Sequence, residues 1–129
     1  MLLFARYAIV RAGRFTFSFN QVYKGVLMKV YQKLVRDRIP EICTKNGQKA
    51  NTSVLDEVSY QQALRKKLVE EVNEYLESGE TEELADIAEV IDALAKSAGS
   101  SFQTVLSIKE AKAAKNGKFE KRLFLDSVE

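Results

Sequence analysis

The chain has 129 residues, of which 46% are hydrophobic and 29% are charged, which is typical of one folded domain and excludes wholesale disorder. It contains a single cysteine, Cys43, and no histidine, which excludes an internal disulfide, a cysteine metal site and a histidine general base. Metal chemistry in this chain must therefore use oxygen ligands, which suit Mg²⁺, Mn²⁺ or Ca²⁺. A lone cysteine also suits a reducing cytoplasm, where we expect the protein to act.

The first 27 residues differ in charge from the rest of the chain. They carry four basic residues and no acid, whereas residues 28–129 hold 16 basic and 18 acidic residues. Because that larger part is nearly neutral, the net charge of +2 gives no argument for binding a nucleic-acid polymer. The apolar run at residues 2–10 is interrupted by Arg6 and is too short to span a membrane, so we expect no membrane partner.

We interpret residues 1–27 as an N-terminal extension and residues 28–129 as the folded domain. Met28 then becomes the natural start, although an acid-free, arginine-rich segment also resembles an organelle transit peptide. Phe15, Phe17 and Phe19 alternate with polar residues, so this part can pair as a strand.

Helix-capping and helix-breaking residues predict four helices in the domain, at about residues 40–44, 56–77, 81–98 and 100–115. Pro40 suits the first turn of the first helix, and Asp56 and Thr81 suit the N-caps of the next two. Ser100 and Gln103 form a capping-box pattern that begins the last helix. A glycine follows each of the last three helices. The sequence thus predicts an all-α fold with short terminal strands, the second of them at residues 119–125.

The two central helices each carry an apolar stripe at helical spacing. The stripe residues are Leu64, Leu68, Val72 and Tyr75 in the first helix, and Leu84, Ile87, Val90, Ile91 and Leu94 in the second.

Two acids at positions i and i+3 border each stripe. At 100° per residue, Glu71 lies roughly 60° and Glu74 roughly 120° from the first stripe. Glu83 lies about 40° from the second stripe and Asp86 about 100°. Glu70 projects in roughly the opposite direction and is expected to be exposed to solvent.

A short turn between these helices makes them antiparallel neighbours, which brings the two acid pairs together. Four neighbouring carboxylates repel one another, and their pKa values rise unless a cation compensates them. A divalent cation resolves this conflict by taking several oxygens at once. The sequence therefore predicts a metal site formed by Glu71, Glu74, Glu83 and Asp86.

Ordinary explanations exist for single members of this set. A Glu-x-x-Glu pair on a charged helix is usually solvated surface, and Lys67 with Glu71 fits a simple i,i+4 ion pair. Glu83 fits a first-turn acid that the helix dipole favours. None of these explanations accounts for two acid pairs that border apolar stripes on consecutive helices.

The acid motifs also carry a family resemblance. Residues 70–74 (EEVNE) followed by residues 83–86 (ELAD) resemble the metal-binding motifs of the MazG-like all-α nucleoside triphosphate pyrophosphohydrolase superfamily. Residues 33–40 (KLVRDRIP), together with Lys112 and residues 116–122 (NGKFEKR), are similar to the opening and closing segments of its phosphoribosyl-ATP pyrophosphohydrolase-like branch. The resemblance covers about residues 28–125.

This resemblance implies a helical bundle that a homodimer or homotetramer completes. It implies Mg²⁺, with Mn²⁺ as a substitute, bound by Glu71, Glu74, Glu83 and Asp86. It also implies hydrolysis of a nucleotide substrate between the α- and β-phosphates, which yields a monophosphate and pyrophosphate, as in housecleaning of the nucleotide pool.

Further roles follow from the same resemblance and from charge. Glu70 or Glu71 is expected to orient the attacking water. Cations offset the charge of a polyphosphate, and the candidate phosphate ligands are Lys33, Arg36, Lys112 and Arg122.

Two other functions fit the same residues. One is a true phosphoribosyl-ATP pyrophosphohydrolase of histidine biosynthesis, which cuts the same kind of bond. The other is a non-catalytic helical oligomerisation or regulatory module with solvated acids, which predicts no Mg²⁺-linked stabilisation and tolerance of Glu83→Gln.

Overall fold

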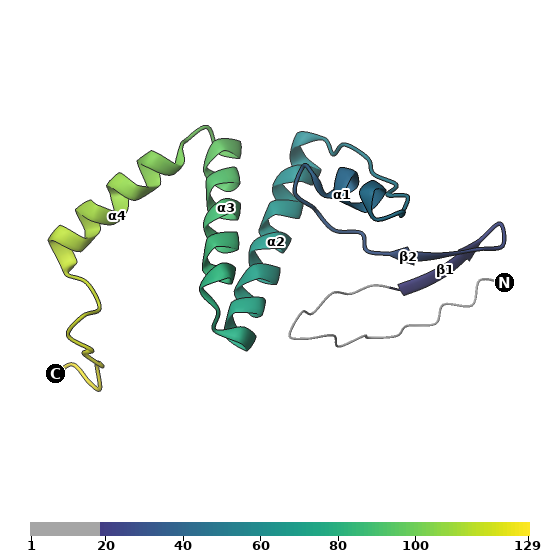
Figure 1. Ribbon diagram of the computed structural model, residues 1–129. Coiled ribbons are helices and arrows are strands. Elements are labelled where there is room, and N and C mark those ends of the chain that lie inside the picture. The colour runs from purple at the N-terminus through teal and green to yellow at the C-terminus, as the bar shows by residue number, and fades with distance from the viewer. Residues whose placement is uncertain (1–18) are drawn as a thin grey trace.

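A computed structural model describes residues 19–129 of the chain, in which helices predominate and a two-stranded sheet precedes them (Figure 1). The elements in chain order are β1 (Phe19–Tyr23), β2 (Val26–Val30), α1 (Ile39–Lys45), α2 (Glu57–Ser78), α3 (Thr81–Ser97) and α4 (Phe102–Asn116). The mainly helical fold class is therefore confirmed. In the part of the chain described here, no helix is both long enough and apolar enough to cross a membrane.

The strands β1 and β2 form an antiparallel hairpin in which Tyr23 pairs with Val26. Lys24 and Gly25 connect them with φ angles of 50° and 76°, the two positive values that a type I′ hairpin turn requires. The hairpin pairs residues on both sides of position 27. The division of the chain into an extension (residues 1–27) and a domain (residues 28–129) stays a prediction. Of the alternating phenylalanines, Phe19 begins β1, and the earlier two lie outside the described residues.

The long helix α2 has the signals that the sequence predicts at both ends. The Asp56 carboxylate accepts a 2.7 Å hydrogen bond from the Ser59 amide, and bonds from Ser59 lower the pKa of Asp56. Gly79 follows the helix with a φ of 67°, and its N–H donates to the Tyr75 carbonyl at 2.8 Å. The next helix starts with Thr81 as its first residue, so the prediction of Thr81 as an N-cap is wrong, and Glu80 takes that place without a side-chain bond.

The junction between α3 and α4 differs by one residue from the predicted capping box. The Ser100 amide donates to the Ala95 carbonyl at 2.8 Å, so Ser100 closes α3 after Gly99. Ser101 has an extended backbone, and its hydroxyl accepts from the Thr104 amide at 3.1 Å. Ser101 is therefore the N-cap of α4, and the prediction of Ser100 is wrong.

The C-terminal tail (residues 117–129) contains no strand, so the strand predicted at residues 119–125 is wrong. The Arg122 amide donates to the Phe119 carbonyl at 3.2 Å, and Arg122 has a φ of 56°, which together turn the chain. A strand also needs a partner, and the β1/β2 hairpin lies on the other side of α2 (Figure 1).

The helices α2 and α3 lie side by side and antiparallel, whereas α4 leads away from them (Figure 1). Within the described part of the chain, the buried apolar residues are Leu64, Val90 and Ala95. Val72 and Leu84 belong to the predicted stripes but are exposed in the single chain. Among the described elements α4 contacts only α3. Large apolar side chains stay exposed on α4 and the tail: Leu106, Ile108, Phe119, Leu123, Phe124, Leu125 and Val128.

Candidate metal centre

Three carboxylates are buried where α2 packs on α3. Glu71 and Glu74 on α2 are 5% and 7% exposed, and Glu83 on α3 is 6% exposed. Charged side chains are almost never buried to this degree unless a partner compensates them. The helical projection placed these acids beside the apolar stripes, and the packing of the two helices accounts for their burial.

Glu71, Glu83 and Asp86 form the centre of the site. Each offers a carboxylate oxygen that lies within 4.8 Å of the corresponding oxygens of the other two. One buried oxygen of Glu83, Oε2, has no hydrogen-bond partner among the described residues. Leaving a buried carboxylate oxygen unpaired is energetically costly.

Glu74 lies beside this three-acid group without belonging to it. Burial raises the pKa of the Glu74 carboxyl, and the charges of Glu71 and Glu83 raise it further. The Glu74 carboxylate is therefore close enough to sense the group electrostatically. It is the remaining oxygen donor of the four that the sequence predicted.

Lys67 supplies a compensating charge to Glu71 from the same helix. Its Nζ lies 2.6 Å from Glu71 Oε1 and 3.1 Å from Glu70 Oε1, and its side chain is mostly buried. Burial opposes the charged form of Lys67, but hydrogen bonds to Glu71 and Glu70 outweigh it and raise the pKa of the ammonium. The i,i+4 spacing of Lys67 and Glu71 was visible in the sequence, but their burial was not.

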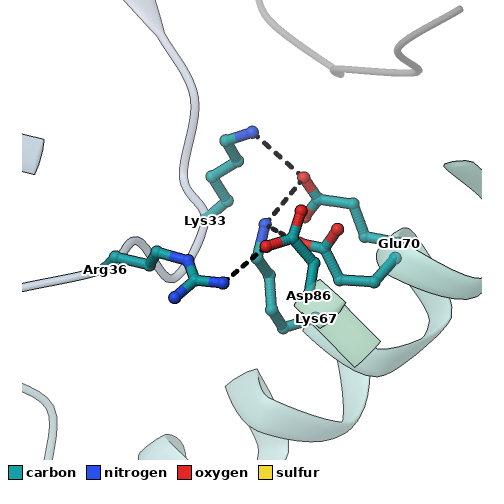
Figure 2. Close-up of polar contacts among 6 residues, drawn as sticks. Lys33, Arg36, Lys67, Glu70 and Asp86 are labelled. Atoms are coloured by element: carbon teal, nitrogen blue, oxygen red, sulfur yellow. Dashed lines mark hydrogen bonds and ion pairs between the residues drawn. The ribbon is translucent and has the colours of Figure 1, made fainter. Parts of the chain in front are cut away.

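Glu70 is not the exposed residue that the helical projection predicts. Its side chain is 18% exposed, and Glu70 Oε1 accepts from Lys33 Nζ at 3.0 Å as well as from Lys67 (Figure 2). The projection considers only the helix itself, whereas the segment between β2 and α1 lies over this part of α2. The prediction that Glu70 is exposed to solvent is therefore wrong.

Arg36 comes from the same segment and reaches α3. Its Nη2 donates to Asp86 Oδ1, a member of the three-acid group (Figure 2). The hydrogen bond to Asp86 raises the pKa of the Arg36 guanidinium. The structure thus brings Lys33 and Arg36, two of the four predicted phosphate ligands, to the rim of the acid cluster.

Lys112 and Arg122 do not reach the cluster within one chain. Lys112 lies on α4 and Arg122 in the C-terminal tail, and both side chains are exposed. Neither forms an ion pair with any residue between 19 and 129. Because α4 leads away from α2 and contacts only α3 among the described elements, the structure does not bring these two cations to the acids (Figure 1).

The arrangement as a whole sets carboxylate oxygens from two helices opposite cations from a third segment. Such a site can hold a divalent cation on its oxygens and an anion on its lysine and arginine. Comparisons of the chain with protein-family models, curated proteins and solved structures found no match.

Proposed function

We propose that this chain is a Mg²⁺-dependent nucleoside triphosphate pyrophosphohydrolase that cleaves between the α- and β-phosphates. The observation that carries the proposal is the three-acid group, in which Glu71 and Glu83 are buried and Glu83 Oε2 has no hydrogen-bond partner among residues 19–129. The motif resemblance of residues 70–74 and 83–86 adds the reaction class to this physical argument. The alternative of a phosphoribosyl-ATP pyrophosphohydrolase rests on the same acids and differs only in the substrate.

The donor set fits a hard divalent cation. Carboxylate oxygens are the ligands that Mg²⁺ prefers, and Mg²⁺ holds them at about 2.1 Å, so two ligands of one ion lie at most about 4.2 Å apart. The observed separations of up to 4.8 Å need only a small closure of the side chains. Glu71, Glu83 and Asp86 would hold the ion, and Glu74 is placed to join them.

The proposed reaction assigns separate roles to the metal ion, the two rim cations and the two glutamates. When bound, Mg²⁺ neutralises charge on the phosphates and supplies or orients the attacking water. Lys33 and Arg36 lie at the rim and would donate hydrogen bonds to phosphate oxygens. Of the two glutamates expected to orient water, Glu71 lies within the three-acid group, and Glu70 lies outside it, held by two lysines.

The proposed enzyme is a homodimer or homotetramer. Its support is the small apolar core of the single chain together with the exposed apolar side chains of α4 and the tail. Patches of this kind mark association surfaces. A second copy would also bring Lys112 and Arg122 within reach of the acids.

One observation favours a non-catalytic regulatory module. Arg36 and Lys67 already pair with Asp86 and Glu71 of the three-acid group, so protein cations alone balance part of its charge. This alternative predicts that added metal changes nothing.

The deciding experiment measures pyrophosphate release from a panel of common and modified nucleoside triphosphates and from phosphoribosyl-ATP, with Mg²⁺ and with EDTA. Release that requires Mg²⁺ supports the enzyme and identifies its substrate. No release from any substrate, together with no thermal shift on adding Mg²⁺ or Mn²⁺, would favour the module.

A further inference from the structure

Lys67 occupies an unusual place, because a mostly buried ammonium contacts a carboxylate of the candidate metal site. Its Nζ forms a 2.6 Å ion pair with Glu71 Oε1, and Glu71 offers an oxygen to the three-acid group with Glu83 and Asp86. Lys67 and Glu71 lie four residues apart on α2, so the helix backbone fixes their spacing.

Glu70 anchors the same lysine from a second side. Glu70 Oε1 accepts from Lys67 at 3.1 Å and from Lys33 at 3.0 Å, so one oxygen is shared by two ammonium groups (Figure 2). Glu70 is absent from the three-acid group. Lys33, Glu70, Lys67 and Glu71 thus form a line of alternating charges, which runs from the segment before α1 to a candidate metal ligand.

We propose that Lys67 is a positioning residue of the metal site, which holds the Glu71 carboxylate in its ligating orientation. This inference rests on the proposed function, because it assigns a role beside the same ion. A carboxylate has about four lone-pair sites, so Glu71 can accept from Lys67 and still bind a cation. Outer partners that orient metal ligands typically contribute about 10- to 100-fold to metal affinity.

A competing role would have the opposite effect on affinity. If the Lys67 ammonium merely filled the place of the metal, its removal would free Glu71 and tighten metal binding. Positioning predicts weaker binding when Lys67 is neutral. The sign of the change therefore separates the two roles.

The test is a titration of the full chain with Mn²⁺, in which the electron paramagnetic resonance signal of the free ion measures how much Mn²⁺ is bound. We expect Lys67→Met and Lys67→Gln to weaken Mn²⁺ binding by about 10- to 100-fold. Lys67→Arg keeps the charge and should restore most of the affinity, which a purely structural loss would not show. Lys66→Met, at the neighbouring exposed position, should bind like the wild type.

Each other outcome overturns a defined part of the account. If Lys67→Met binds Mn²⁺ as tightly as the wild type or more tightly, the positioning role is overturned and the proposed function still stands. Unfolding of both neutral variants, seen by circular dichroism, would make Lys67 a determinant of the fold and also overturn the role. Absence of Mn²⁺ binding by the wild type would overturn the proposed function and the role together.

Discussion

The α2/α3 pair buries charged side chains, whereas the C-terminal part of the molecule exposes apolar ones. The first buries Glu71, Glu74 and Glu83, whereas α4 and the tail leave side chains such as Phe119 and Phe124 exposed. Buried acids require a compensating charge, and exposed apolar patches mark contact surfaces. Under the proposed function, a ligand would complete the first region, and another copy of the chain would complete the second.

The largest expected effect on stability tests whether the α2/α3 pair is the folding core. Leu64 is one of three buried apolar residues among residues 19–129, so Leu64→Ala should lower the free energy of unfolding by about 2–5 kcal/mol. Urea denaturation measures the change. Val58→Ala, at an exposed position on the same helix, should alter stability by less than about 0.5 kcal/mol. Equal effects at the two positions would contradict the placement of the core.

The second prediction tests whether the exposed tail is an association surface. Burial of a Phe or Leu side chain contributes about 1.5–3 kcal/mol, so Phe124→Ser or Leu125→Ser should weaken self-association roughly 10- to 100-fold. Analytical ultracentrifugation across a concentration series measures this change, and Ser127→Ala serves as the matched control. A wild-type chain that stays monomeric at every concentration would refute the proposed oligomer.

The third prediction uses the raised pKa of Glu74. Because burial favours the neutral form in the folded state, Glu74 supports the metal-free fold at low pH. That support is lost as pH rises from the ordinary glutamate value of 4.5 through the raised pKa. Glu74→Gln should therefore stabilise the metal-free protein at neutral pH while weakening Mn²⁺ binding. Thermal unfolding against pH measures the first effect, and Glu77→Gln is the exposed control on α2. Destabilisation by Glu74→Gln at neutral pH would contradict the repulsion argument.

The smallest expected effect concerns the start of α4. Ser101→Ala removes the side-chain cap and should destabilise this helix by about 1 kcal/mol, seen as faster amide hydrogen exchange in its first turn. Ser100→Ala should leave that exchange unchanged, because only the backbone amide of Ser100 makes a structural bond. The reverse result would restore the capping box that the sequence suggested.

The sequence predicts α2, α3 and their acids well because the signals there are local. Asp56 and Gly79 delimit α2, and the 3.6-residue period sets the face on which Glu71 and Glu83 lie. The turn around Gly79 is short, and a short connection makes consecutive helices pack as antiparallel neighbours.

The remaining features depend on contacts that no local pattern encodes. Lys33 and Arg36 reach acids 37 and 50 positions away, so the partial burial of Glu70 could not be predicted from its own helix. The strand predicted at residues 119–125 is absent because a strand needs a partner edge for its backbone hydrogen bonds, which the local sequence does not show. The two serines before α4 are chemically identical, and only the closing bond of α3 decides between them.

The most direct test of the central claim is Mg²⁺-dependent pyrophosphate release by the wild type, Glu83→Gln and Glu89→Gln. Glu89 lies on α3 but is exposed, which makes it the matched control for buried Glu83. We predict release by the wild type and by Glu89→Gln that EDTA abolishes, and loss of release in a folded Glu83→Gln variant. Undiminished release by Glu83→Gln, or release that persists in EDTA, would contradict the claim that the buried acids form a catalytic metal centre.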